Sequence, residues 1–100
     1  GWWGEAAEHG DPLAMVNLGV AYATGVGVEQ DYEQAMRWYR ASADKGHAAG
    51  QYGVGVMYQY GDGVPRDLAE ARRWYELAAA QGDVRARESL RLLNAEGSTR

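Results

Sequence analysis

The chain has 100 residues, 46% of them hydrophobic, and a formal net charge of −4, which predicts at most one folded domain with a modest core. The absence of a basic run argues against nucleic acid and anionic membranes as partners, and no apolar run approaches the roughly 20 residues that a membrane span needs. Cysteine is absent, so the chain can form neither a disulfide nor a cysteine-based metal site.

The sequence repeats itself with a period of 36 residues. The offset relates Trp38-Tyr39 to Trp74-Tyr75, Tyr22 to Tyr58, Gly25 to Gly61, Gly27 to Gly63 and Asp31 to Asp67. Such a period without a strand signal indicates a solenoid of helix pairs. The expected organisation is a single domain, 1–100, with a partial repeat at 1–10, repeats at 11–46 and 47–82, a capping helix at 83–97 and a tail at 98–100.

The first residues, 2–9, align with the second half of the second helix of a repeat whose first helix is missing. Trp2 and Trp3 therefore lack part of the cover that the repeat would give them. Two explanations stay open. The chain is cut from a longer array, which we favour, or these tryptophans dock on a second copy and form a homodimer.

Each complete repeat predicts two helices, which we name the A helix and the B helix in chain order. The A helix has apolar residues at helical spacing, for example Leu18 and Tyr22. The B helix has the same spacing and carries the Trp-Tyr pair. Because that pair recurs in phase with the apolar face, we expect Trp38 and Trp74 to pack in the core between helices.

Turn and cap residues mark the ends of these helices. The Asp-x-x-Gln/Glu patterns that begin at Asp31 and Asp67 look like capping boxes that start the B helices. Asp11 is a good cap for the first A helix, whereas His47 is a weaker cap at the aligned position. Gly25 is expected to end the A helix in a left-handed conformation.

The motifs N-LG-x2-Y-x2-GxGV-x2-D at 17–31 and A-x2-WY-x2-A at 35–42 recur in part at 60–67 and 71–78. This pattern resembles the Sel1-like repeat, a relative of the tetratricopeptide repeat. The resemblance implies an all-α fold, a right-handed α/α superhelix of about two and a half helix-turn-helix repeats. It also implies a non-catalytic adaptor or scaffold role in protein complexes, often bacterial. The last A helix departs from the pattern, with Arg91 where the earlier A helices have glycine.

The glycine-rich segments TGVGVEQD, 24–31, and YGDGVPRD, 60–67, raise the question of phosphate binding, because glycine loops that open a helix often hold phosphate. A Walker loop needs Lys and Ser or Thr after its second glycine, and a dinucleotide loop needs a preceding strand and a third glycine. In the first segment Glu29 and Asp31 follow the second glycine instead. Both segments are therefore interpreted as turns between helices, and we expect no cofactor.

Ser42-Ala-Asp-Lys45 matches the S-x-x-K nucleophile motif of serine β-lactamases, but the companion motifs are missing. Ser42 occupies a small-residue position that Ala78 fills in the next repeat, so a packing role is favoured. A β-lactam-binding or hydrolysing enzyme stays as the alternative, and otherwise we expect no enzyme activity and no catalytic residue. His9 and His47 are interpreted as solvated residues at helix ends, not as a metal site.

In stacked helix pairs the A helices line the concave surface, so their positions turned away from the B helices predict where a peptide or protein partner binds. The predicted partner-binding residues are Val16, Val20, Ala23, Tyr52, Val56, Gln59, Tyr60, Arg85 and Glu88. The alternatives are that these residues pack between neighbouring A helices, or that the domain is a structural spacer of a longer array. The sequence does not indicate the compartment.

Overall fold

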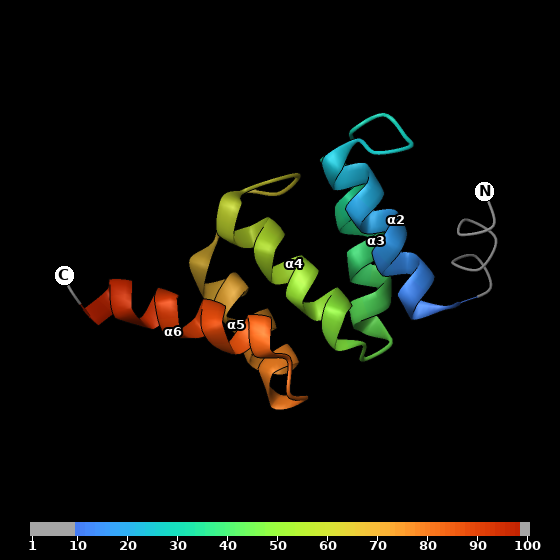
Figure 1. Cartoon of the computed structure of the whole chain (residues 1–100). Coiled ribbons are helices and arrows are strands. Elements are labelled where there is room, and N and C mark those ends of the chain that lie inside the picture. The colour runs from blue at the N-terminus through green and yellow to red at the C-terminus, as the bar shows by residue number, and fades with distance from the viewer. Residues whose placement is uncertain (1–9, 99–100) are drawn as a thin grey trace.

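The structure, a computed structural model, describes residues 10–98. It contains α2 (Pro12–Thr24), α3 (Tyr32–Asp44), α4 (Ala48–Tyr60), α5 (Leu68–Ala80) and α6 (Val84–Ser98) (Figure 1). These residues include no strand, so the predicted all-α fold is confirmed. The A helices of the repeat are α2, α4 and α6, and the B helices are α3 and α5.

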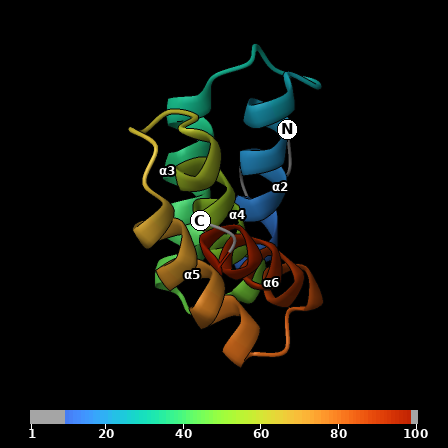
Figure 2. The ribbon, with the colours of Figure 1, turned by 90° about the vertical axis from the view of Figure 1, so that its left-hand side faces the viewer.

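The helices form two layers. In Figure 1 the A helices lie toward the viewer and the B helices behind them. Figure 2 shows the layers edge-on, with α3 and α5 on one side, α2 and α6 on the other, and α4 set between them. Each helix packs on its neighbours in the chain, and α2 also contacts α4. The result is the expected stack of helix pairs.

Each B helix begins at an aspartate cap. Oδ1 of Asp31 accepts hydrogen bonds from two backbone N–H groups in the first turn of α3, at 3.1 and 3.2 Å. The predicted capping box is only half formed, because the backbone N–H of Asp31 donates to the carbonyl of Tyr22 at 2.8 Å. Asp67 donates to the carbonyl of Tyr58 in the same way, at 3.0 Å. As expected, His47 is a weak cap, since its side chain makes no capping hydrogen bond.

The loops after α2 and α4 each turn at a glycine and are held by a side chain. Gly25 has a φ of 76°, which confirms the left-handed end predicted for α2. Five residues later, Nε2 of Gln30 donates to the carbonyl of Ala23 at 2.8 Å. At the aligned position, Nε of Arg66 donates to the carbonyl of Gln59 at 3.0 Å. Both loops are thus fastened to the last turn of the preceding A helix.

Tyrosine rings of the B helices fill the spaces between A helices. Tyr39 is 8% exposed and lies against Gly19 of α2 and Gly53 of α4. A Cβ atom at these two glycines would lie 2.7 and 2.6 Å from the ring. Tyr75 is fully buried and lies against Gly55 in the same way. The glycines therefore set how closely the helices of neighbouring layers approach.

The prediction that both tryptophans pack between helices is confirmed, but Trp74 is buried and Trp38 only partly so. Trp74 is 6% exposed and lies beside the guanidinium groups of Arg40 and Arg73, 5.1 and 4.9 Å from the ring centroid. Trp38 is half-buried against a small cluster on α2. Part of the cover of Trp74 comes from the preceding B helix through Arg40. The residue at the aligned position before Trp38 is residue 4, which lies outside the described residues.

Candidate partner-binding surface

The first two A helices carry no charged residue. Their sequences are PLAMVNLGVAYAT for α2 and AAGQYGVGVMYQY for α4, in a chain of which 24% is charged. The charges of each repeat lie instead on its B helix and in its loops, and α6 is the first A helix that carries them. The surface that α2 and α4 show to solvent is therefore electrically neutral.

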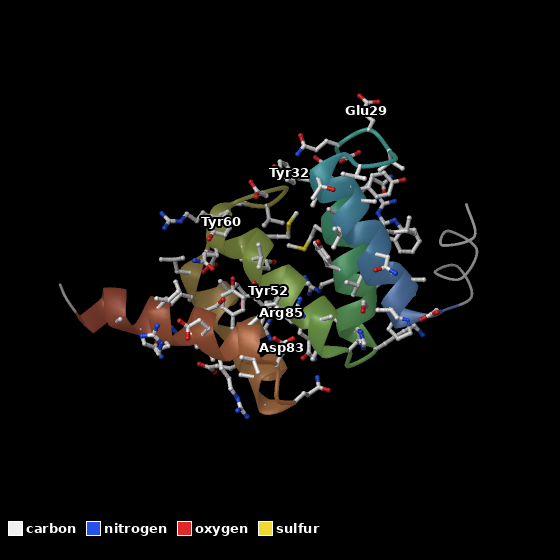
Figure 3. All side chains as sticks on the ribbon, viewed as in Figure 1. Glu29, Tyr32, Tyr52, Tyr60, Asp83 and Arg85 are labelled. Atoms are coloured by element: carbon white, nitrogen blue, oxygen red, sulfur yellow. The ribbon has the colours of Figure 1, made fainter. Side chains whose placement is uncertain are left out.

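Branched apolar residues occupy one repeat position across this surface. Val20 is 46% exposed, Leu92 is 50% exposed, and Val56 between them is half-buried. They are 36 residues apart along the chain, so they occupy the equivalent position on each of the three A helices, and we name this set the apolar row. Tyr60, at the end of α4 (Figure 3), is 65% exposed and lies one helical turn after Val56. Exposed apolar residues gathered on one face are typical of interaction sites.

The other predicted residues of α2 are more buried than Val20 and, like Val56, pack against the core. Val16 and Ala23 are half-buried and pack against the core cluster that contains Tyr39 and Val54. Their side chains contribute to the contact between the two repeats. This leaves Val20 as the residue of α2 in the predicted set with the most accessible side chain.

Tyr52, Arg85 and Asp83 form a cluster between α4 and α6 (Figure 3). The ring of Tyr52 packs on Tyr75, with centroids 5.7 Å apart, and the guanidinium of Arg85 lies 4.5 Å from the centroid of Tyr52. Arg85 also donates to Asp83, 3.1 Å from Nη2 to Oδ2 and 3.4 Å from Nε to Oδ1. Burial of Asp83 opposes its ionisation, but hydrogen bonds from Arg85 and from the Ala86 backbone lower the pKa of its carboxyl overall.

Gln59 and Glu88 already have partners within the protein. Oε1 of Gln59 accepts a hydrogen bond from the hydroxyl of Tyr75, and its backbone carbonyl accepts one from Arg66. Glu88 forms an ion pair with Arg91 at 2.6 Å on the surface of α6. The sequence predicted the outward face from helical phase, but it could not show which of these polar groups the fold itself would engage.

The loop at 24–31 borders an open hollow of about 520 Å³. Its lining residues are Tyr22, Val28, Glu29, Gln30, Asp31 and Gln34. Two of the six are carboxylates and none is basic, so the hollow repels phosphate, in agreement with the interpretation of this segment as a turn. Within residues 10–98, no group of three or more His, Asp or Glu side chains could hold a metal ion.

The candidate nucleophile Ser42 has no exposed surface. Its hydroxyl donates to the carbonyl of Pro12 at 3.0 Å and so ties α3 to the start of α2. Lys45, by contrast, is exposed. A Cβ at Gly50 would lie 2.7 Å from the Ser42 hydroxyl oxygen, so helix packing also closes this site from the side of α4. These contacts give Ser42 the packing role that the repeat pattern favoured.

A family model described as Sel1 repeat matches residues 12–47 and 48–83. The chain belongs to the Sel1 repeat family. Sel1 repeat proteins generally serve as protein-interaction modules and are typically non-catalytic. The two matched Sel1 repeats contain the pairs α2–α3 and α4–α5, and α6 follows them.

Two solved structures extend this comparison. A Sel1 repeat protein from Oxalobacter formigenes is 42% identical, with a TM-score of 0.86, over 90% of this chain and 68% of that one. A protective antigen present in uropathogenic Escherichia coli strains, which displays an SLR fold, is also 42% identical, with a TM-score of 0.92. That match covers 96% of this chain and 21% of the antigen. A comparison with curated proteins found no match.

Other predictions concern residues outside this surface. Trp2 and Trp3, through which a homodimer was predicted, lie outside the described residues, as does His9. In the part of the chain that the structure describes, no helix combines the length and hydropathy that a membrane span requires. Of the predicted partner-binding residues, those with exposed side chains on the A helices are Val20, Tyr60, Arg85 and Glu88.

Proposed function

We propose that this Sel1 repeat domain captures a segment of a partner protein across the outward surface of α2, α4 and α6. The observation that carries the proposal is the combination of two A helices without charge and an apolar row exposed on them. Burying the neutral apolar surface of α2 and α4 against a partner is favourable, and on these two helices no ion has to lose its hydration.

The B helices fit this role less well. The exposed face of α3 carries Glu33, Arg37, Arg40 and Asp44, and α5 carries a similar mixture of charges. Ions of both signs make such a face well solvated, and the core of a protein interface is depleted of charged residues. The A-helix surface is therefore the better candidate for binding.

The test is selection of a random dodecapeptide library on the whole chain. Val20→Ser combined with Tyr60→Ala removes apolar area from the proposed surface at two exposed positions, so the fold should persist. The matched control is Leu77→Ser, because Leu77 is 43% exposed on the B helix α5. Circular dichroism and thermal unfolding establish that each variant is folded before binding is compared.

We expect the selected peptides to lose about tenfold or more in affinity for the double variant, as expected when apolar anchors contribute more than 1.4 kcal/mol together. The control should change affinity by less than about twofold. Equal binding to the double variant, or loss with Leu77→Ser, would place the site elsewhere. A library that yields no binder would favour the spacer role.

A further inference from the structure

Among the described residues, one ion pair differs from the others, and it lies at the start of the A helix α6. In the pairs Arg40–Asp44, Glu70–Arg73 and Glu88–Arg91, the two side chains are between 36% and 66% exposed. In the pair Arg85–Asp83, the arginine is 59% exposed and the aspartate only 9%. The acid is thus covered while the base faces solvent. Although the pair is neutral in sum, a ligand arriving from solvent meets the cation first.

The fold holds Arg85 in place before any ligand arrives. Asp83 is itself fixed, because Oδ1 accepts a hydrogen bond from the backbone N–H of Ala86 at 3.1 Å. The guanidinium lies over the ring of Tyr52, which packs on the buried Tyr75. A side chain that is already ordered loses little conformational entropy when it binds. A flexible arginine on the surface would lose more.

The same geometry leaves part of the guanidinium free. A guanidinium has five N–H donors, and Asp83 engages those on Nε and Nη2. Among the described residues, no hydrogen bond uses Nη1 of Arg85, so its donors remain available to a carboxylate. Hydrogen bonds between arginine and carboxylate are about twice as strong as neutral ones. The nearest acid on α6 outside the pair, Glu88, is engaged by Arg91.

We infer that the captured segment carries an aspartate or glutamate side chain that binds Arg85, while its apolar residues lie on the apolar row. This inference rests on the proposed function. Leu92 follows Arg85 by seven residues, or about 10 Å along α6. An Asp or Glu side chain of a segment that lies on the apolar row can span this distance together with the side chain of Arg85. A terminal carboxylate would instead require the segment to leave the row.

The first experiment analyses the peptides selected on the whole chain. We expect most peptides that require Val20 and Tyr60 to contain an Asp or Glu at a fixed distance from apolar residues. Selection on Arg85→Gln should abolish this acidic preference. The matched control is Arg91→Gln, which removes one arginine of an exposed pair on the same helix. Peptides without an acidic preference, or the same preference on Arg85→Gln, would overturn the inference.

The second experiment measures the contact itself by a double-mutant cycle. Binding of one selected peptide and of its Glu→Gln form is compared on the wild type and on Arg85→Gln by titration calorimetry. Each single change should weaken binding about five- to tenfold, and the second change should add less than about twofold once the first is present. Independent, multiplicative effects of the two changes would contradict a direct contact.

Two further arms separate the possible failures. Amidation of the peptide C-terminus should leave affinity within about twofold, whereas a large loss would point to a terminal carboxylate and overturn the side-chain assignment. If the peptides lose affinity for the Val20/Tyr60 variant but not for Arg85→Gln, the proposed binding surface is supported and the contact between the peptide carboxylate and Arg85 is contradicted. If no peptide depends on Val20 and Tyr60, the proposed function fails and this inference fails with it.

Discussion

At the residue scale, glycines of the A helices make room for tyrosine rings. Gly19 and Gly53 lie against Tyr39, and Gly55 lies against Tyr75. The sequence showed the Trp-Tyr pair recurring but not which of two adjacent aromatic residues points between the helices, because neighbours in a helix differ by only about 100°. Glycine in a helix interior is unfavourable unless packing requires it. These glycines were therefore the sequence signal that the tyrosine ring, and not the tryptophan ring, packs against the A helices.

Replacing Gly53 by Ala should destabilise the domain by about 1–3 kcal/mol, because the new methyl group would collide with the ring of Tyr39. Urea unfolding measures the change. With Tyr39→Ala as the background, the same substitution should be neutral or stabilising, because the collision is gone and alanine is about 1 kcal/mol better than glycine in a helix. An equal cost in both backgrounds would mean that the ring does not fill this space.

Burial raises the pKa of the Tyr75 hydroxyl, with a smaller contribution from neighbouring Tyr52. The unfolded chain ionises near the ordinary value of about 10, so above that pH it releases a proton that the folded protein retains. The stability that the neutral hydroxyl contributes is present below about pH 10 and is lost as the pH rises above it.

Unfolding free energy measured by urea titration should therefore fall more steeply above about pH 10 in the wild type than in Tyr75→Phe. The variant begins less stable, because it lacks the hydrogen bond to Gln59. The same slope in the wild type and in Tyr75→Phe would show that burial does not hold the Tyr75 hydroxyl in its neutral form.

At the scale of the helix, the sequence showed where helices begin. It did not show every hydrogen bond that holds a loop to the preceding helix. Asp11 and Asp31 cap their helices as predicted. The bonds from Gln30 and Arg66 to the preceding helix were missed, although both residues occupy one repeat position and carry a long N–H donor. Sequence spacing shows that two positions are equivalent, but the donor's target depends on the path of the loop.

Helix caps give a matched pair of predictions. Asp67→Ala should cost about 0.5–2 kcal/mol, because it removes the hydrogen bond to the first turn of α5. His47→Ala should change stability by less than about 0.5 kcal/mol, because this cap makes no side-chain bond. His47→Asp should stabilise α4, as the aligned Asp11 does α2. Thermal unfolding checks all three, and equal costs for the two alanine variants would contradict the cap assignments.

At the scale of the whole molecule, the repeat period was enough to predict an all-α stack of helix pairs, because each pair buries its apolar face on the next. The outward face of the A helices followed from helical phase. The Arg85 cluster could not be predicted in this way, since it depends on how α6 lies beside α4. The capping role of α6 and the homodimer remain predictions from sequence.

The division of charge between the layers is the basis of the proposed function. A solenoid exposes both faces of its stack, and here the B helices carry mixed charges while α2 and α4 carry none. The A-helix face combines exposed apolar residues with an ordered arginine, Arg85, whose acidic partner is covered. A binding site on the other face would leave this asymmetry without a role.

The most direct measurement is nuclear magnetic resonance of the whole chain, with methyl and amide shifts followed as a selected peptide is added. The proposed function predicts that the largest changes fall on the methyl groups of Val20, Val56 and Leu92 and on the amide of Tyr60. Shifts confined to the exposed faces of α3 and α5, with the apolar row unchanged, would contradict it.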